Sequence, residues 1–196
     1  MYKDPRLWDR INSYALVSYI PEPLAGFLDR LRQELVPNCF LHAHITVLPP
    51  RPVAAPEDAW RTLKNLIPLY APFEVQMTDV EVFPVSDVIY VDIAKGSEQL
   101  RPLHDALAVE GLQSHEEYSY HPHVTLAQDL KPDELDELLT VARARWAEVR
   151  FEKTFRVEKL VFVQNTRTNE WIDLAECMLG EPHSEIDGEL TGLLAR

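Results

Sequence analysis

Two periods of hydrophobic residues follow one another along this chain, and together they indicate a mixed fold of helices and strands. Between residues 24 and 35 the apolar residues return at the spacing of one helix face: Leu24, Phe27, Leu28, Leu31 and Leu35. Short runs rich in β-branched and aromatic residues, such as 14–20 directly before that helix, indicate strands instead. The first half is therefore predicted to contain strand 14–20, helix 24–35, strand 40–48 ended by Pro49 and Pro50, a helix over 60–70 and strand 73–83.

The same order of elements is expected a second time. It comprises strand 88–93, helix 100–107, strand 121–127 and helix 135–146, followed by strands near 151–157, 160–164 and 171–174. The two series are offset by about 75 to 79 positions, which aligns Tyr14 with Tyr90 and Leu24 with Leu100. A repeat of this length indicates two similar lobes rather than a solenoid of shorter units. We predict an α+β fold: a bilobal pseudo-twofold duplication of a β-α-β-α-β unit, with antiparallel-rich sheets around a central cleft.

Composition along the chain indicates one domain followed by a tail. Residues 1–175 are expected to form the domain, with lobes at approximately 12–83 and 88–175 joined by the Pro-containing stretch 84–87. Residues 176–196 hold five acidic residues and one Arg, which predicts a mobile acidic C-terminal tail.

The charge balance limits the partners that this protein can have. With 19 basic and 32 acidic residues, the formal net charge is −13. Proteins that coat long nucleic acid without sequence preference cover its phosphates with Lys and Arg, so this class is excluded, whereas a small nucleotide or an RNA end is compatible with the charge. No apolar run reaches the roughly 18 residues of a membrane span, the first residues lack the pattern of a signal peptide, and the two cysteines are typical of reduced thiols. We expect a cytoplasmic protein without a membrane partner.

One short motif occurs in corresponding strands of the two predicted lobes. Residues 41–48 read Leu-His-Ala-His-Ile-Thr-Val-Leu, and residues 120–127 read Tyr-His-Pro-His-Val-Thr-Leu-Ala. Both segments contain His-x-Thr, and the two histidines, His44 and His123, lie 79 positions apart. Because side chains alternate between the faces of a strand, His42, His44 and Thr46 are expected to share one polar face, and His121, His123 and Thr125 another.

These groups suit phosphoryl chemistry. One imidazole can take a proton from an attacking water or hydroxyl while the other protonates the leaving oxygen, and the ordinary histidine pKa of about 6.5 allows both roles. The hydroxyls of Thr46 and Thr125 can donate hydrogen bonds to non-bridging phosphate oxygens. A single His-x-Thr in a strand is usually structural, but few core packings require the same polar pair twice at one register. The doubled motif therefore favours catalysis.

The paired motifs resemble the signature of the 2H phosphoesterase superfamily, which includes the 2′-5′ RNA ligase-like proteins and cyclic phosphodiesterases. Residues 88–91 and 117–123 are most similar to its bacterial YjcG-type branch. The resemblance implies a bilobal fold, a catalytic set of His44, Thr46, His123 and Thr125, and hydrolysis of 2′,3′-cyclic or related phosphodiesters. It also implies 2′-5′ joining in some members, and neither a metal nor a nucleotide cofactor. Many members have an Arg or an apolar residue before the Pro-His of the second motif, where this chain has His121.

Further residues are candidates for binding the substrate. They are the histidines two positions before each motif, His42 and His121; the strand tyrosines Tyr14 and Tyr90; Phe83, which can stack on a base; and Arg51, which can contact phosphate. Each has a competing structural interpretation: strand ends in solvent for the histidines, and core packing for the aromatic residues.

Two other classes of protein fit the same residues. The His-x-His pairs at 42–44 and 121–123 have a spacing that presents two imidazoles to a metal such as zinc, although this leaves the matched threonines unexplained. The second alternative is a module that binds a nucleotide or an RNA end without turning it over.

Overall fold

The computed structural model describes residues 9–37, 39, 41–109, 111–131 and 133–180. Its elements, in chain order, are β1 (Arg10–Tyr19), α1 (Leu24–Leu35), β2 (His44–Arg51), α2 (Pro56–Leu66), the short 3-10 helix η2 (Ile67–Leu69), β3 (Phe73–Val82), β4 (Ile89–Ile93), α3 (Ser97–Leu107), β5 (His123–Ala127), α4 (Leu135–Ala147), β6 (Thr154–Val157), β7 (Lys159–Thr166) and β8 (Trp171–Met178).

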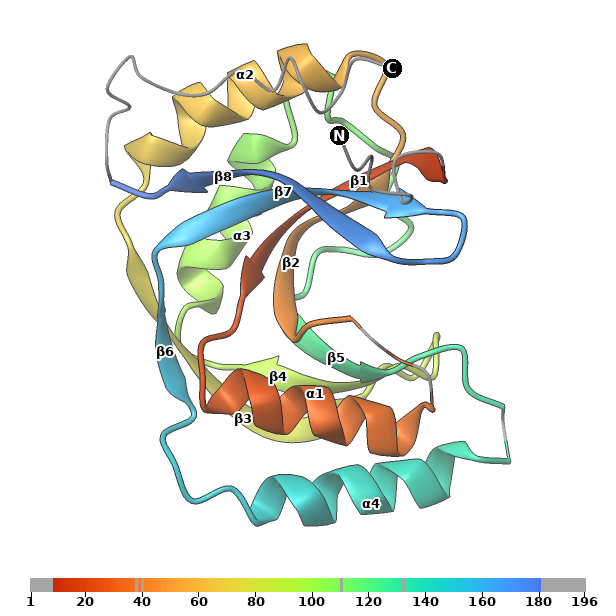
Figure 1. The fold of residues 1–196 in the computed structure, drawn as a ribbon. Helices are drawn as coiled ribbons and strands as arrows, with labels where there is room; N and C mark the ends of the chain where they lie inside the picture. Colours follow the sequence, from red (N-terminus) through yellow and green to blue (C-terminus); the bar gives the residue numbers. More distant parts are fainter. Residues whose placement is uncertain (1–8, 38, 40, 110, 132, 181–196) are drawn as a thin grey trace, which may run out of the picture.

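The strands form two four-stranded antiparallel sheets in an α+β fold. The first sheet has the order β2-β1-β7-β8 and the second the order β5-β4-β3-β6. In Figure 1 the first sheet curves through the upper half of the molecule and the second lies in the lower half. The motif strands β2 and β5 each lie at an edge of their own sheet.

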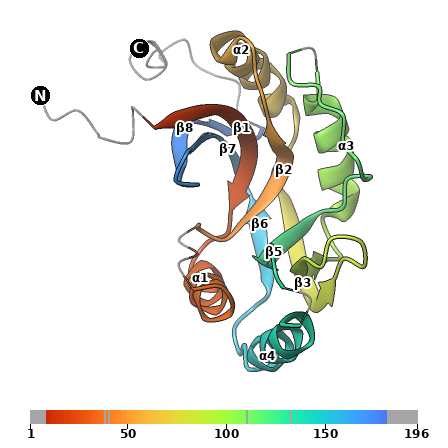
Figure 2. The same cartoon turned by 90° about the vertical axis from the view of Figure 1, so that its right-hand side faces the viewer.

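The helices lie on the outer sides of the two sheets. Helices α2 and α3 cover the first sheet, and α1 and α4 cover the second (Figures 1 and 2). Helix α1 follows a strand of the first sheet yet contacts β5 and α4, and α3 follows a strand of the second sheet yet contacts β2. Each half of the chain therefore supplies a helix to the other half, and most buried apolar residues belong to one continuous core.

The predicted division into lobes 12–83 and 88–175 is corrected by the sheet topology. Strand β3 pairs with β4 and β6 in the second sheet, while β7 and β8 return to the first sheet and β7 pairs with β1. The short connection 83–88 explains why β3 pairs with β4 in the second sheet, because antiparallel strands joined by a tight turn pair with each other. Each lobe thus contains segments from both halves of the sequence.

The predicted helices form as their apolar residues indicated. In α1 the buried side chains are Leu24, Leu28, Leu31 and Leu35, together with one charged residue, Arg32. Helix α2 begins with Pro56, whose fixed φ suits the first turn, followed by the acidic Glu57 and Asp58 at the positive end of the helix dipole.

Several strand boundaries differ from the prediction. Strand β2 begins at His44 rather than at residue 40, and it continues through Pro49 and Pro50 to Arg51. Proline is tolerated there because β2 is an edge strand, where a missing N–H need not break a ladder. Strand β5 begins at His123 rather than at residue 121, and β8 extends to Met178, into the region expected to be tail. The remaining tail residues, 181–196, lie outside the described residues.

Within the described ranges, no helix combines the length and apolar character needed to cross a membrane.

Candidate active site

The two motif strands lie next to one another although they belong to different sheets. Strands β2 and β5 contact each other across the boundary between the sheets, and Figure 1 shows them meeting at the centre of the molecule. Along each strand, burial alternates as the sequence predicted: His44 and Thr46 are partly exposed, whereas the intervening Ile45 is fully buried. The second motif repeats this pattern. The fold therefore brings the two His-x-Thr pairs together on partly accessible faces.

Each motif imidazole is oriented by a backbone carbonyl. The Nδ1 atom of His44 lies 2.6 Å from the carbonyl oxygen of His42, and Nδ1 of His123 lies 2.7 Å from that of His121. A carbonyl oxygen only accepts, so Nδ1 must carry the proton in both rings. In the neutral imidazole Nε2 is then the unprotonated nitrogen, and it is available to accept a proton from a substrate.

Both imidazoles are held in surroundings that disfavour their charged form. Burial lowers the pKa of His44 to about 4, with smaller contributions from the charges of Arg32 and His123. Burial also lowers the pKa of His123, while the nearby Asp92 carboxylate opposes this shift. The charge of His123 contributes to the lowered pKa of His44, so the two imidazoles lie near enough to influence one another's surroundings.

The motif threonines have hydroxyls free to bind a ligand. Within the described part of the chain, neither Thr46 nor Thr125 uses its side-chain oxygen in a hydrogen bond, and both residues are partly exposed. A hydroxyl at this position can donate to a phosphate oxygen at no cost in protein hydrogen bonds.

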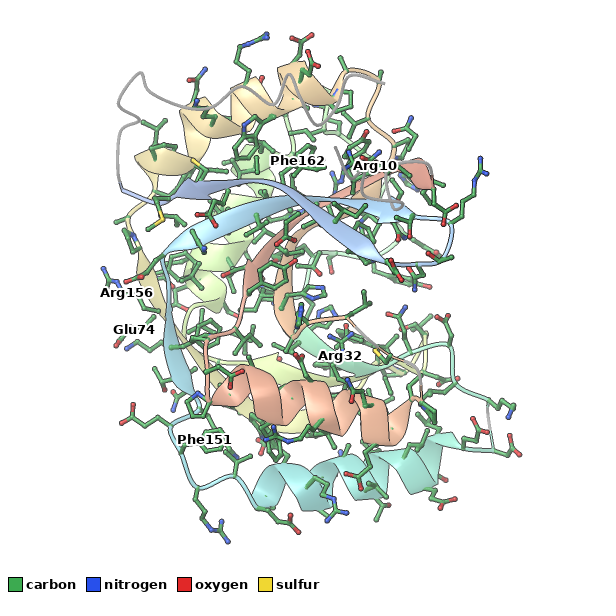
Figure 3. The ribbon with its side chains drawn as sticks, viewed as in Figure 1. Arg10, Arg32, Glu74, Phe151, Arg156 and Phe162 are labelled. Carbon is green, nitrogen blue, oxygen red and sulfur yellow. The ribbon has the colours of Figure 1, made fainter. Side chains whose placement is uncertain are left out.

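Helix α1 fixes the segment that precedes the first motif. Asp29 accepts a hydrogen bond from the backbone N–H of Ala43 at 2.6 Å, and its other oxygen lies 3.0 Å from Nδ1 of His42. The buried Arg32 donates from one nitrogen to the carbonyl oxygens of Leu41 and His42, each at 3.2 Å. Figure 3 labels Arg32 on the side of α1 that faces the first sheet. The carbonyl that orients His44 is thus also held by a guanidinium.

A different set of groups surrounds the second motif. Nε2 of His121 lies 2.8 Å from a carboxylate oxygen of Asp92, on the neighbouring strand β4. Phe83 stacks on Tyr90 with their ring centroids 3.9 Å apart, and each of these rings presents an edge-type contact to His123 at 5.0 and 5.4 Å. The predicted candidates Phe83, Tyr90 and His121 therefore lie beside the second motif histidine.

The first-motif candidates are placed less uniformly. His42 precedes the strand and is largely exposed, with a side chain at 80% relative accessibility, so it does not share a strand face with His44. The tyrosine beside the first motif is Tyr19, which lies opposite His44 in the ladder and donates to Asp173 at 2.5 Å. Sequence reasoning missed Tyr19 because only the register shows that it faces the motif.

Tyr14 lies in the core rather than at the motifs. It stacks on Phe162, and its hydroxyl accepts a hydrogen bond from Gln164 at 2.9 Å. Figure 3 shows Phe162 on the side of the first sheet that α2 covers. The sequence alignment of Tyr14 with Tyr90 does not match the ladders, because Val17 is the residue opposite Thr46, as Tyr90 is the residue opposite Thr125.

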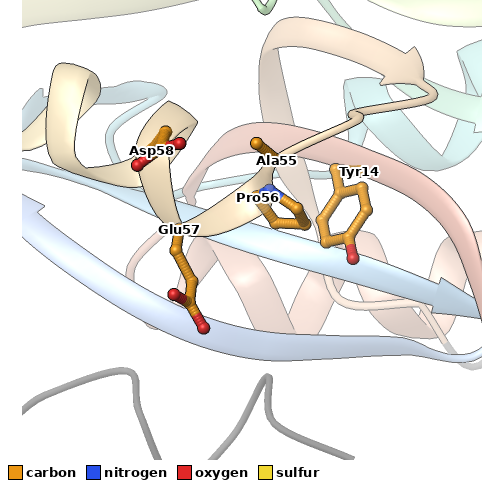
Figure 4. Close-up of a pocket in the computed structure, with 5 residues that line it drawn as sticks. All are labelled: Tyr14, Ala55, Pro56, Glu57 and Asp58. Carbon is orange, nitrogen blue, oxygen red and sulfur yellow. The ribbon is translucent and has the colours of Figure 1, made fainter.

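A hollow near Tyr14 does not provide an alternative site. It is lined by Tyr14, Ala55, Pro56, Glu57 and Asp58 at the start of α2 (Figure 4). Its two carboxylates disfavour a phosphate, and none of the motif residues lines it.

Arg51 is a structural residue, not the exposed phosphate ligand that the sequence suggested. It is 2% exposed, and its guanidinium donates to the carbonyl oxygens of Pro49 and Leu112 and to the carboxylate of Glu116. These bonds use its donors inside the protein.

The paired histidines do not form the four-imidazole metal site that their spacing suggested as an alternative. His42 is paired with Asp29 and His121 with Asp92, and the Nδ1 atoms of both motif histidines face carbonyls. Over the ranges that the structure describes, no three side chains of His, Cys, Asp or Glu come together in a group able to hold a metal ion.

Sequence comparison identifies the family. The model of the 2′-5′ RNA ligase superfamily matches residues 20–169, so the chain belongs to this superfamily. A Bacillus licheniformis protein named "Putative phosphoesterase" is 30% identical over 136 residues, which cover 67% of this chain and 80% of that protein. A Bacillus pumilus protein of the same name is 26% identical over 172 residues, covering 86% of this chain and 98% of its own. Membership of this superfamily and these relatives assign the chain to the phosphoesterases.

Solved structures show the same fold. E. coli LigT complexed with NADP+ superimposes with a TM-score of 0.61 at 17% identity, covering 88% of this chain and 98% of LigT. LigT complexed with 3′-AMP gives 0.61 at 16% identity, over 88% of this chain and 98% of LigT. Usb1 of Kluyveromyces marxianus gives 0.54 at 15% identity, over 83% of this chain and 97% of Usb1.

Proposed function

We propose that this protein is a metal-independent phosphodiesterase that opens a 2′,3′-cyclic phosphate on a nucleotide or an RNA end, or a similar small phosphodiester. The observation that carries the proposal is the pair of motif imidazoles, each with Nδ1 on a carbonyl and Nε2 left for the substrate. Membership of the 2′-5′ RNA ligase superfamily and similarity to proteins named as phosphoesterases support it.

In the proposed reaction, His44 is the general base and His123 the general acid. Nε2 of His44 takes a proton from a water molecule, whose oxygen forms a bond to phosphorus. The bond from phosphorus to one ribose oxygen breaks, and Nε2–H of protonated His123 gives its proton to that oxygen. Thr46 and Thr125 donate hydrogen bonds to the non-bridging oxygens, whose negative charge increases in the transition state.

The surroundings of the two histidines support these roles. Arg32 lies behind His44 and opposes its protonation, so His44 is neutral and able to act as a base over most of the pH range. The charges that act on the pKa of His123 are those of His121, which disfavours the imidazolium, and of Asp92, which favours it, and neither is a permanent cation like Arg32. The two halves of the site are therefore suited to opposite ends of one proton transfer.

We propose that the nucleoside of the substrate binds beside the second motif. Phe83 and Tyr90 offer stacked rings beside His123, and an unpaired base binds to proteins by stacking on such rings. His121, held by Asp92, takes the position where many members of the resembled superfamily have an Arg or an apolar residue. We propose that it contacts the phosphate or the ribose there.

The same two imidazoles can also support 2′-5′ joining when the 5′-hydroxyl of a second ribose takes the place of water. Nε2 of His44 then takes the proton of that hydroxyl, its oxygen bonds to the phosphorus of the 2′,3′-cyclic phosphate, and the bond from phosphorus to the 3′ oxygen breaks as His123 protonates that oxygen. We further assign the chain to the bacterial YjcG-type branch, on the residues from Glu117 to His123. Small nucleotides or RNA ends are the proposed substrates, and E. coli LigT has been solved with 3′-AMP and with NADP+.

The test is a panel of nucleoside 2′,3′-cyclic phosphates, 2′-5′-linked oligonucleotides and ADP-ribose cyclic phosphate, assayed in EDTA with the product isomer identified. Turnover that is lost in both His44→Ala and His123→Ala supports the proposal. Binding of these ligands without turnover by the wild type would instead indicate a non-catalytic nucleotide-binding module. Activity that disappears in EDTA and returns with added zinc would contradict metal independence.

A further inference from the structure

The two motif strands need something other than a sheet to hold them in register. Among the pairings in the described residues, β2 is joined to β1 and β5 to β4, and no ladder joins β2 to β5. A ladder fixes the separation of its strands by repeated backbone hydrogen bonds. The separation of the two His-x-Thr motifs must therefore be set by side chains that cross from one sheet to the other.

Tyr120 makes such a crossing at the motifs themselves. Its hydroxyl donates a hydrogen bond of 2.8 Å to the carbonyl oxygen of Thr46, 74 positions earlier in the chain. Tyr120 immediately precedes His121, whose carbonyl orients the imidazole of His123. One side-chain hydrogen bond thus connects the backbone of the first motif with the segment that positions the second.

His104 on α3 supports the same contact. It is buried, stacks face to face on Tyr120 with ring centroids 4.0 Å apart, and its Nδ1 donates to the carbonyl oxygen of Val47 at 2.7 Å. Consecutive carbonyls of β2, those of Thr46 and Val47, are therefore held by two stacked side chains from the other half of the sequence.

A partly buried ion pair anchors the loop that carries Tyr120. Arg51, at the end of β2, contacts Glu116 at 2.7 Å and the carbonyl of Leu112 at 2.5 Å, and the second oxygen of Glu116 lies 3.5 Å from Nε2 of His104. Arg101 on α3 donates to the carbonyl of Tyr120 at 2.6 Å. Residues 112–120, which lead to the second motif, are therefore bound to β2 at both ends: Leu112 contacts Arg51, and Tyr120 contacts Thr46.

We infer that Tyr120 and His104 are positioning residues that hold the two motif strands at the separation which catalysis requires. The inference rests on the proposed function, since neither residue is expected to touch the substrate. Loss of the Tyr120 hydroxyl leaves its ring stacked on His104 but releases the carbonyl of Thr46. Because proton transfer depends on near-contact geometry, the expected effect falls on kcat, while KM, set by stacking and phosphate contacts, changes little.

The test is the Tyr120→Phe variant, with Tyr118→Phe as the matched control. Tyr118 is an exposed tyrosine two positions earlier whose hydroxyl bonds to the adjacent Glu117, so its loss removes a hydroxyl of the same loop without touching β2. We expect Tyr120→Phe to lower kcat about 10- to 100-fold with KM within about threefold, and Tyr118→Phe to keep both values.

A double mutant separates positioning from simple destabilisation. In the Thr46→Val variant, the added Tyr120→Phe change should lower kcat by about threefold or less. The reason is that a shift of β2 matters less when the hydroxyl of Thr46 is already missing. His104→Phe keeps an aromatic ring for stacking but loses the bond to Val47, and a smaller loss of kcat is expected from it. A variant that unfolds at lower temperature but keeps the wild-type kcat well below that temperature would overturn the inference, as would fully multiplicative losses in the double mutant.

A second readout does not need turnover. The pKa of His44 can be followed by NMR of the imidazole nitrogens, and the charge of His123 contributes to its lowering. When the strands separate in Tyr120→Phe, the pKa of His44 should move toward the value measured in His123→Ala, whereas Tyr118→Phe should match the wild type. An unchanged value in Tyr120→Phe would contradict the inference. Absence of turnover by the wild type on the whole panel, with this shift still observed, would overturn only the proposed function.

Discussion

In both halves of the molecule a motif histidine donates its Nδ1 proton to the carbonyl two residues earlier, but different groups stand behind that carbonyl. On the first side a helix supplies them: Arg32 binds the carbonyl of His42, and Asp29 binds the following N–H. On the second side Arg101 of α3 binds the carbonyl of Tyr120, the neighbouring strand supplies Asp92 to His121, and Phe83 and Tyr90 pack beside the imidazole.

In the proposed reaction, the two copies of the motif take unequal roles. Hydrolysis of a phosphodiester needs one unprotonated and one protonated group at the start. Burial lowers the pKa of both imidazoles, and a carboxylate opposes this on each side, Asp29 for His44 and Asp92 for His123. The permanent charge of Arg32 adds to the lowering at His44, whereas the cation that acts on His123 is the titratable His121. In the proposed reaction the repeat supplies the two reacting imidazoles, and the differences in their surroundings assign their roles.

The largest expected effect is loss of either motif histidine. His44→Ala and His123→Ala should each lower kcat by about 10²–10⁴-fold, because each removes one proton transfer. Steady-state kinetics on a 2′,3′-cyclic phosphate will measure this. His115→Ala, at an exposed position outside the site, is the matched control. A variant that kept most of its rate would remove its histidine from the mechanism.

Replacing the threonines tests whether the two halves share the phosphate. Thr46→Val and Thr125→Val keep the β-branched shape but lose the hydroxyl, and each is expected to lower kcat by about 10²–10³-fold, the usual cost of one donor to transition-state charge. Similar losses in both variants would indicate a phosphate held from both strands. A large loss in only one would place the phosphate against a single motif.

Replacing Phe83 asks whether the base binds on the second side. Phe83→Leu removes the ring that stacks on Tyr90 and should raise KM about tenfold, in line with the energy of base stacking, with kcat little changed. A ribose 2′,3′-cyclic phosphate without a base is the control substrate, and its KM should not respond. Equal sensitivity of both substrates would show that Phe83 acts on the motif and not on the base.

The smallest expected effect is a shift in pH dependence. The pKa of His44 is about 4 and that of His123 is lowered from the ordinary 6.5. As the pH increases, kcat/KM should rise through about pH 4, where His44 loses its proton, and should then decrease where His123 loses its proton, with the midpoint of this decrease at a pH lower than 6.5. Arg32→Gln should move the lower arm upward, because a positive charge that opposes protonation of His44 is lost, while Arg30→Gln on the same helix should leave it in place. A lower arm that does not respond to Arg32→Gln would contradict the assignment of His44 as the base.

The same shifts predict the direction of acid sensitivity. Each motif histidine binds a proton more readily in the unfolded chain, where its pKa is ordinary, than in the folded protein. The unfolded state therefore takes up more protons as the pH falls below 6.5, so the contribution of these groups to folding stability decreases from pH 6.5 toward pH 4. Urea unfolding at pH 7 and pH 5 will measure the decrease, and His44→Gln should make it smaller.

Local sequence patterns determined much of this protein. The leucine spacing predicted α1, the alternation of polar and apolar residues predicted that His44 and Thr46 share a face, and the repeat of His-x-Thr predicted two related strands. These features follow from the geometry of a single helix or strand, which depends on residues a few positions apart. Arg32 and His104 are polar residues on the buried faces of their helices. The apolar pattern of the sequence did not predict which groups they contact.

Only the tertiary structure decided which segments meet. Sheet order moved β3 into the second sheet and β7 and β8 into the first, and the ladder register placed Tyr19 and not Tyr14 beside the first motif. The burial of Arg51 against Glu116 and the bond from Tyr120 to Thr46 also join residues more than 60 positions apart. Such contacts depend on how whole sheets and helices pack, and no short-range period in the sequence encodes them.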